Sequence, residues 1–217
     1  YEIKEWNEKN FDVNIIPYTK EAYQAKRWAF VSDYARFWII YNYGGLYFDT
    51  DVEIVKPIDD IINTGDFMGC ETFASENTPF FVNPGLGFGC HKGNKTIGDL
   101  LQIYSSLHFV QNGKENLTSI VYYTSDYLLS VGAKKINEIQ KINDIVIYPK
   151  DYFNPWDGKK GAFVLKLDTR TIHHFAGSWF TPKERFMQYV ENKFGKLGVE
   201  IIHNIYVFFK NVKRKFN

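Results

Sequence analysis

Apolar residues recur along the chain with two periods, one typical of helices and one of strands. Over residues 20–43 they recur every three to four positions, which predicts an amphipathic helix in one piece or two. The clearest apolar stripe of this segment consists of Phe30, Tyr34, Phe37 and Tyr41. Gly44 and Gly45 follow and predict the end of the helix, because glycine adopts the left-handed cap conformation at little cost.

The other patterned segments alternate between strand and helix. Short apolar or alternating runs predict strands at residues 1–6, 46–48, 52–55, 67–71, 86–90, 145–148, 162–167 and 171–174. Helical periods predict helices at residues 97–107 and 119–131, and a capping box at Thr181 to Glu184 predicts a further helix that begins at Pro182. Interleaved strands and helices indicate an α/β fold.

Composition narrows the class of protein. The 217 residues suit one globular domain, with 45% hydrophobic and 24% charged residues. A net charge of +1 gives no argument for binding nucleic acid. Cys70 and Cys90 form neither a metal-binding pattern nor a disulfide framework, so free thiols in a reducing cytosol are expected. Because the chain opens on Tyr1 and not on Met, we also expect that native sequence precedes it.

The C-terminal residues combine apolar and basic side chains. The basic residues near the end are Lys210, Lys213, Arg214 and Lys215. This pattern fits an amphipathic helix on the anionic inner face of a membrane, and it equally fits a terminal helix packed on its own domain. We expect one domain over residues 1–194 and a basic amphipathic helix over residues 195–217, in a cytoplasmic protein with possible peripheral membrane contact.

Two carboxylates follow the short apolar run at residues 46–48. In an extended chain Asp49 and Asp51 point to the same side, with Cα atoms about 6.5 Å apart. Such a pair can bind Mg²⁺ or Mn²⁺, which prefer oxygen ligands, and a diphosphate can fill the ion's open positions. An Asp-x-Asp sequence alone also fits a solvated loop.

A second charged pair lies in the predicted helix at residues 20–43. Asp33 and Arg36 are three residues apart and share a face, in a row with Ala29 and Ile40 that is otherwise small and apolar. Charges in such a row are usually paired or directed at a polar ligand. The alternative is a surface salt bridge of little energetic value.

These motifs together resemble glycosyltransferase family 32. The family comprises sugar transferases with an Asp-x-Asp motif, includes capsular-polysaccharide enzymes and is akin to the catalytic domains of large glucosylating toxins. The matching residues are Asp33-x-x-Arg36, then Tyr43-Gly44-Gly45-Leu46-Tyr47-Phe48-Asp49-Thr50-Asp51, then Asn83-Pro84-Gly85-Leu86-Gly87-Phe88-Gly89, and finally His173-His174-Phe175-Ala176-Gly177-Ser178-Trp179. One departure is the strand and loop that precede this region in the family and are absent here.

The resemblance implies a GT-A fold, in which helices flank a Rossmann-like sheet that binds a nucleotide sugar. It implies a retaining transfer, with Mn²⁺ or Mg²⁺, from a UDP- or GDP-sugar to a glycan or lipid-linked glycan, in surface or capsular polysaccharide synthesis. Asp49, Asp51 and His174 are the implied metal ligands. The implied catalytic residues are Asp33, Arg36, Asp49 and Asp51, and the implied donor-binding residues are Ser32, Asp33, Arg36, Asn83, Gly85, Ser178 and Trp179.

Some assignments stay open at this point. His173 and His174 face opposite sides of a strand, so one of them at most serves the site, and the resemblance favours His174. Asn83 and Gly85 also fit a turn without a ligand. Glu71, at a strand end near the same sheet edge, is either an acceptor-binding group or without a role. Two other functions remain possible from the residues: a phosphatase of the haloacid dehalogenase type, and a non-catalytic glycan-binding module bridged by a cation.

Overall fold

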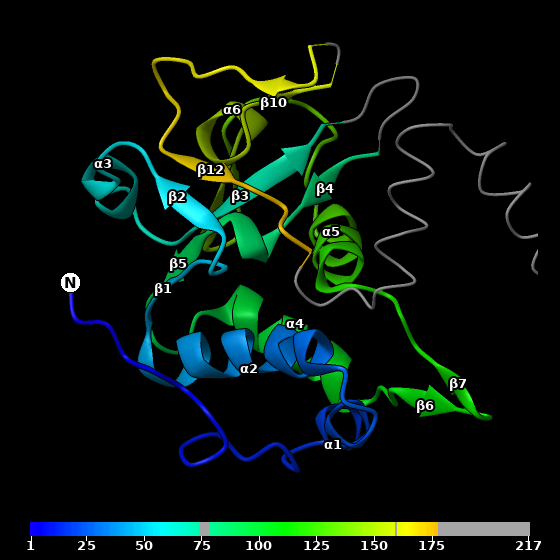
Figure 1. Ribbon diagram of the computed structural model, residues 1–217. Coiled ribbons are helices and arrows are strands. Elements are labelled where there is room, and N and C mark those ends of the chain that lie inside the picture. Colours follow the sequence, from blue (N-terminus) through cyan, green and yellow to red (C-terminus); the bar gives the residue numbers. More distant parts are fainter. Residues whose placement is uncertain (74–78, 159, 178–217) are drawn as a thin grey trace, which may run out of the picture. The chain divides into compact units, whose positions relative to one another are not determined.

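The computed structural model describes residues 1–73, 79–158 and 160–177 (Figure 1). Nearly all of the described residues belong to one compact unit, Tyr1–Phe175. The predicted helix that begins at Pro182 and the predicted basic helix at residues 195–217 lie outside the described residues. Ser178 and Trp179, expected at the donor, lie outside them too.

The central sheet of this unit has six strands and mixed directions. Its order is β1 (Gly45–Tyr47), β5 (Phe88–Cys90), β3 (Phe67–Thr72), β9 (Ile145–Tyr148) and β8 (Gln140–Ile142), with β4 (Phe81–Val82) paired to β3. The pair β3–β9 is parallel, and the other pairs described in this sheet are antiparallel. The α/β prediction is confirmed in this form, as a mixed sheet with helices.

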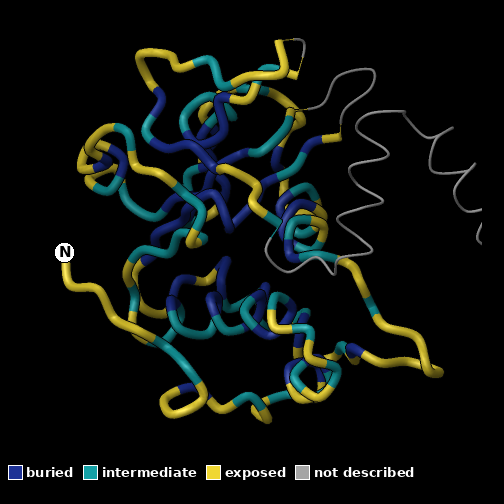
Figure 2. Tube along the Cα trace, in the orientation of Figure 1, coloured by how far each residue is buried: buried dark blue, intermediate teal, exposed yellow. Residues whose placement is uncertain are grey.

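Helices pack on both faces of the sheet. Because successive strand residues point to opposite faces, neighbouring residues of one strand belong to different cores. The larger apolar core joins the sheet to α1 (Pro17–Gln24), α2 (Trp28–Tyr43), α4 (Lys95–Ser105) and α5 (Ile120–Ser130). On β3, Met68 belongs to this core, whereas its neighbour Phe67 belongs to a smaller one with α3 (Asp59–Ile62) and α6 (Lys150–Phe153). Figure 2 shows buried residues in the strands of the sheet and in the helices that pack against it. None of the described helices is long and apolar enough to cross a membrane.

Short two-stranded pairs complete the unit. The pair that matters for function is β2 (Val52–Ile54) with β12 (Thr171–His173), because it joins the segment after β1 to the end of the described chain. The others are β6 (Val110–Gln111) with β7 (Lys114–Glu115), and β10 (Trp156–Asp157) with β11 (Ala162–Phe163). A 3₁₀ turn, η1 (Pro84–Leu86), precedes β5.

The predicted helix at residues 20–43 is two helices, because the chain turns at Lys26, whose φ is 59°. Gly44, with φ of 72°, ends α2 as expected. The strand predicted at residues 162–167 is shorter, and only Ala162–Phe163 pairs.

The strand predicted at residues 1–6 is wrong. Tyr1 and Ile3 are 89% and 95% exposed, and no described strand pairs with this segment. The Trp6 ring instead packs on α2, with ring centroids 6.2 Å from Trp38 and 4.9 Å from Tyr43. The alternating pattern therefore reflects one aromatic anchor and not a hydrogen-bonded ladder.

Candidate metal and donor site

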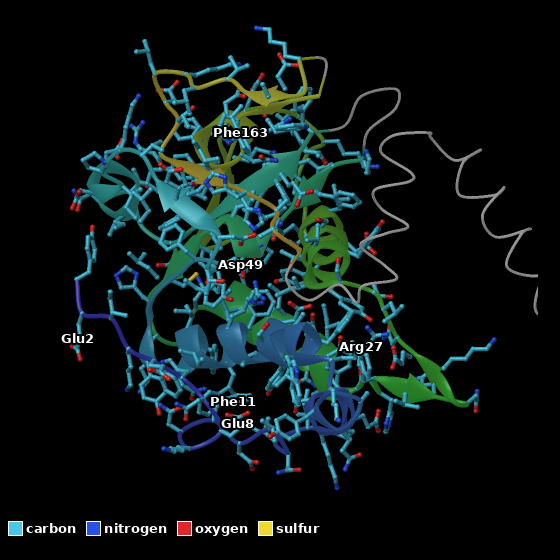
Figure 3. All side chains as sticks on the ribbon, in the orientation of Figure 1. Glu2, Glu8, Phe11, Arg27, Asp49 and Phe163 are labelled. Atoms are coloured by element: carbon cyan, nitrogen blue, oxygen red, sulfur yellow. The ribbon has the colours of Figure 1, made fainter. Side chains whose placement is uncertain are left out.

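Asp49 and Asp51 lie in a tight turn between β1 and β2, and Asp49 is labelled in Figure 3. The N–H of Val52 donates to the carbonyl of Asp49 at 3.1 Å, which closes the turn. The N–H of Asp49 donates to the carbonyl of Gly85 at 3.0 Å. The two residues are thus brought together by a turn and not by the extended strand that we expected. The hydrogen bond to Gly85 attaches this turn to η1.

Arg36, on α2, links the two charged pairs that the sequence singled out. Its Nη1 donates to Asp49 Oδ1 at 2.9 Å, and its Nη2 donates to Asp33 Oδ1 at 3.1 Å. The guanidinium lies 4.6 Å from the centroid of the Tyr47 ring, and the Tyr47 hydroxyl donates to the same Asp49 oxygen at 2.9 Å. The Arg36 side chain is only 6% exposed, which excludes the surface salt bridge that was the alternative.

Further hydrogen bonds from the N-terminal half of α2 and the start of α5 fix Arg36 and Asp33 in position. Ser32 accepts two hydrogen bonds from Arg36, at its Oγ from Nη2 and at its carbonyl from Nε. The N–H of Ile120 donates to Asp33 Oδ2 at 3.3 Å. Both carboxylate oxygens of Asp33 therefore have a protein partner.

The two carboxylates that flank Arg36 titrate in opposite directions. Burial raises the pKa of Asp33 to about 6, and the Arg36 charge and the Ile120 N–H oppose this rise only in part. Burial also acts to raise the pKa of Asp49, but the His173 imidazole, Arg36 and the Tyr47 hydroxyl outweigh it and lower the pKa to about 2. Asp49 is thus a carboxylate at neutral pH, as a metal ligand must be.

His173 is the third group beside the two carboxylates. Its Nε2 lies 3.5 Å from Asp49 Oδ2 and 3.4 Å from Asp51 Oδ1. One ligand atom from each of the three residues lies within 4.8 Å of the others, a spacing that could hold a metal ion. The register of β2 with β12 places this histidine here, because it puts His173 opposite Val52, directly after Asp51.

His174, the expected third ligand, is not the histidine that the structure places beside Asp49 and Asp51. Its Nε2 lies 3.0 Å from Glu53 Oε2, its ring packs edge-on to Phe163, and its side chain is 48% exposed. The two histidines do face opposite sides of the strand, as expected, but the phase is reversed. That phase depends on pairing with β2, some 120 residues earlier, and the local sequence carries no signal for it.

Asn83 and Gly85 reach the site through η1. Asn83 Oδ1 accepts from the N–H of Gly85 at 2.7 Å, which is the turn chemistry that its sequence indicated. A Cβ built on Gly85 would collide with Asp49 Oδ2, so only glycine allows the backbone to approach this carboxylate so closely. Tyr47 is a residue of this site that the sequence motifs did not single out, although its position two residues before Asp49 places it on the same side of an extended chain.

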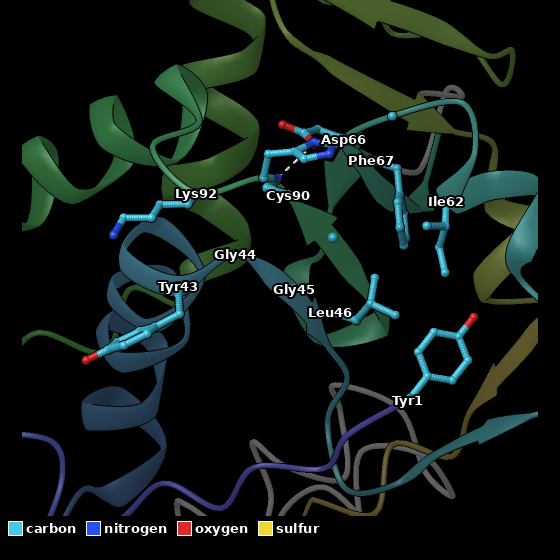
Figure 4. Close-up of a pocket in the computed structure, with 13 residues that line it drawn as sticks. Tyr1, Tyr43, Gly44, Gly45, Leu46, Ile62, Asp66, Phe67, Cys90 and Lys92 are labelled. Carbon is cyan, nitrogen blue, oxygen red and sulfur yellow. Dashed lines mark hydrogen bonds and ion pairs between the residues drawn. The ribbon is translucent and has the colours of Figure 1, made fainter.

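A cavity of about 350 Å³ lies apart from these residues (Figure 4). Its walls include Tyr1, Leu46 of β1, Phe67 at the start of β3, and Lys92 just beyond the end of β5. None of the carboxylates of the candidate site lines it. The chemistry of the site is therefore read from the side chains around Asp49 and not from this cavity.

Comparison with known proteins supports sugar transfer. Residues 1–68 match the family model for the glycosyltransferase sugar-binding region containing the DXD motif. This stretch contains Asp33, Arg36, Asp49 and Asp51, and it ends before His173. No curated protein and no solved structure matches the chain. The match supports a glycosyltransferase in general, and it reaches less than half of the 217 residues.

Proposed function

We propose that the chain is a metal-dependent glycosyltransferase that moves a sugar from a UDP- or GDP-sugar to a glycan or a lipid-linked glycan. The observation that carries this proposal is the convergence of Asp49, Asp51 and His173 within 4.8 Å, beside the Arg36 network, in a chain whose first 68 residues match the DXD family model. A GT-A fold with a nucleotide-binding sheet is part of the proposal, and the mixed sheet with helices on both faces is compatible with it.

The ligand atoms fit a divalent cation. Two carboxylate oxygens suit Mg²⁺ or Mn²⁺, and the imidazole nitrogen favours Mn²⁺ of the two. When bound, such an ion would bind the donor diphosphate and neutralise the charge that develops on it as the sugar leaves. The turn that presents Asp49 and Asp51 and the burial of His173 hold these groups in place beforehand.

His173 must change its tautomer to bind an ion through Nε2. Its Nδ1 accepts from the N–H of Phe175 at 3.0 Å, so a neutral ring carries its proton on Nε2 in this arrangement. Ligation through Nε2 requires that the proton move to Nδ1 and that the Phe175 N–H turn away. The segment after β12 is therefore expected to adjust when the cation and donor bind.

The Arg36 network serves the sugar end of the donor in this proposal. Ser32, Asp33 and Arg36 lie on α2, and hydrogen bonds hold their side chains in fixed positions next to Asp49. Oxygen atoms of Asp33 retain lone pairs that can accept from sugar hydroxyls in addition to their protein donors. Asn83 and Gly85 approach from η1, and Ser178 and Trp179 are proposed to contact the diphosphate on the basis of the resemblance alone.

Retention of the anomeric configuration and a role in surface or capsular polysaccharide synthesis also rest on the resemblance. A cytoplasmic location with peripheral contact to an anionic membrane rests on the basic residues at the end of the sequence. Co-sedimentation with anionic vesicles at low salt tests that contact.

The test of the proposal is donor turnover. The protein is incubated with a panel of UDP- and GDP-sugars, with Mn²⁺, with Mg²⁺ or with a chelator, and release of the nucleoside diphosphate is measured. We expect release from at least one donor, dependent on the metal and strongly reduced in Asp51→Asn. Phosphate release from a simple phosphomonoester instead would indicate the phosphatase, and metal-dependent glycan binding without any turnover would indicate the binding module.

A further inference from the structure

Glu71 lies near the end of β3, and its partly buried carboxylate is hydrogen-bonded through one of its two oxygens. Its Oε2 accepts from Asn83 Nδ2 at 2.7 Å. Among the described residues, no hydrogen bond reaches the other carboxylate oxygen, Oε1. Neither the proposed cation nor the Arg36 network uses this residue.

Three hydrogen bonds in series connect Glu71 to Asp49 of the candidate site. Asn83 donates to Glu71 and, through Oδ1, accepts from the N–H of Gly85 at 2.7 Å. The carbonyl of Gly85 accepts from the N–H of Asp49 at 3.0 Å. The Glu71 carboxylate is therefore linked to Asp49 through Asn83 and the backbone of Gly85 in η1.

The charges that act on Glu71 include one group of the candidate site, His173. Burial raises the pKa of Glu71, and the Asn83 hydrogen bond, the His173 imidazole and the Lys150 ammonium oppose that rise. Glu71 Oε1 is not among the buried polar atoms that lack a partner in the described residues, so this oxygen of the partly buried carboxylate is open to a hydrogen bond from water or a ligand. A polar ligand beside His173 would donate such a bond.

We infer that Glu71 binds the acceptor, by accepting a hydrogen bond at Oε1 from the hydroxyl next to the one that attacks the donor. This inference rests on the proposed function. Hydroxyl groups are the donors that an acceptor glycan offers, and a carboxylate is their strongest partner in the inventory of side chains. When water replaces the acceptor and the donor is hydrolysed, Glu71 accepts from the O–H of that water that is not lost.

The chemistry balances without a proton on Glu71. The acceptor oxygen bonds to the anomeric carbon, and the bond from that carbon to the diphosphate oxygen breaks with its electron pair leaving on the diphosphate. The proton of the attacking hydroxyl also leaves on the diphosphate. Glu71 stays ionised throughout and only fixes the position of the attacking molecule, which lowers the barrier by orientation.

The test is Glu71→Gln, measured by metal-dependent hydrolysis of the nucleotide sugar, a reaction that needs no known acceptor. Glutamine has the same size, and its side-chain oxygen can still accept from Asn83, so the fold and the Asn83 contact are retained. We expect kcat to fall roughly 10- to 100-fold, the size of a lost hydrogen bond to a charged group, while KM for the donor and affinity for Mn²⁺ stay unchanged. Glu53→Gln is the matched control, because Glu53 is an exposed carboxylate that contacts His174, and it should leave kcat unchanged.

The outcomes separate the two claims. If the unaltered protein hydrolyses no nucleotide sugar, the proposed function fails and this inference fails with it. If it does and Glu71→Gln hydrolyses the donor equally well, the proposed function stands and Glu71 only orients Asn83. A rise in donor KM at unchanged kcat would place Glu71 on the donor side and would also overturn the inference. The melting temperature of the variant, compared with that of Glu53→Gln, shows whether a loss of activity is a loss of fold.

Discussion

The two halves of the candidate site differ in how firmly the protein holds them. In the buried half, Arg36 and Asp33 are 6% and 10% exposed, and strong hydrogen bonds of 2.9–3.1 Å join Arg36 to both Asp33 and Asp49. In the open half, Asp51 and His173 approach one another only to 3.4 Å, and the Asp51 side chain is 23% exposed. Asp49 belongs to both halves, with Oδ1 in the first and Oδ2 in the second.

This difference indicates a division of labour. In the buried half, Arg36 already forms ion pairs with both Asp33 and Asp49, so this half keeps its arrangement without a ligand. In the open half, one imidazole lies 3.4–3.5 Å from two carboxylates, too far for strong hydrogen bonds between them. A bound cation would stabilise this half by offsetting the repulsion between the two carboxylates. Substitutions in the first half should therefore affect folding as well as donor binding, and substitutions in the second should affect metal binding and turnover with little effect on folding.

The largest effect is expected from Arg36→Ala. It leaves two carboxylates near one another without their shared cation, and breaking a buried pair in this way costs about 3–5 kcal/mol of unfolding free energy. Urea unfolding measures this loss. Lys95→Ala is the control, because it removes an exposed pair with Asp99 and should cost less than about 1 kcal/mol. Equal costs for both variants would contradict a buried network.

Asp51→Asn should have the opposite profile. Loss of a metal ligand removes several kcal/mol of charge stabilisation in the transition state, so turnover of the donor should fall by roughly 10²- to 10³-fold. The free energy of unfolding should change by less than about 1 kcal/mol, as for most substitutions outside the core. Asp126→Asn, at an exposed position of α5, is the control for turnover. Normal turnover in Asp51→Asn would remove this residue from the site.

The two neighbouring histidines sharpen the boundary of the open half. His173→Ala should weaken Mn²⁺ binding by more than the roughly 10- to 100-fold that loss of an outer-shell partner costs, whereas His174→Ala should weaken it little. Calorimetric titration with Mn²⁺ in the presence of a nucleoside diphosphate measures both. The reverse ranking would mean that β12 pairs with β2 in another register.

The smallest effect is expected from pH, and it has opposite signs at Asp33 and Asp49. The pKa of Asp33 is raised to about 6, so its contribution to stability is full below the unfolded value of 3.8 and is lost as pH rises through about 6. The pKa of Asp49 is lowered to about 2, so its contribution is present above 3.8 and is lost as pH falls toward about 2.

Unfolding measured across this range should therefore separate the two carboxylates. In Asp33→Asn, the stabilisation gained on acidification through about pH 6 should disappear, a change on the order of 1–2 kcal/mol. In Asp49→Asn, the destabilisation below about pH 4 should weaken instead. If both variants changed the same limb of the stability curve, the two carboxylates would not differ in their surroundings as the structure indicates.

Local patterns predicted the buried half better than the open half. The shared face of Asp33 and Arg36 follows from helical spacing, and the position of Asp49 follows from the short strand before it. His173 could not be chosen over His174, because the phase of β12 is set by its pairing with β2. For the same reason the run at residues 1–6 looked like a strand, although its Trp6 packs on α2 instead. Contacts between segments distant in sequence decide such cases.

The central claim is that Asp49, Asp51 and His173 bind a divalent cation, which in turn binds the diphosphate of the donor. Pulsed electron paramagnetic resonance of Mn²⁺ added to the protein, with and without UDP or GDP, tests it most directly. The account predicts a ¹⁴N coupling that persists in His174→Ala and vanishes in His173→Ala, and a ³¹P coupling that appears when the nucleotide is added. A nitrogen coupling that vanishes in His174→Ala instead, or the absence of any phosphorus coupling with either nucleotide, would contradict it.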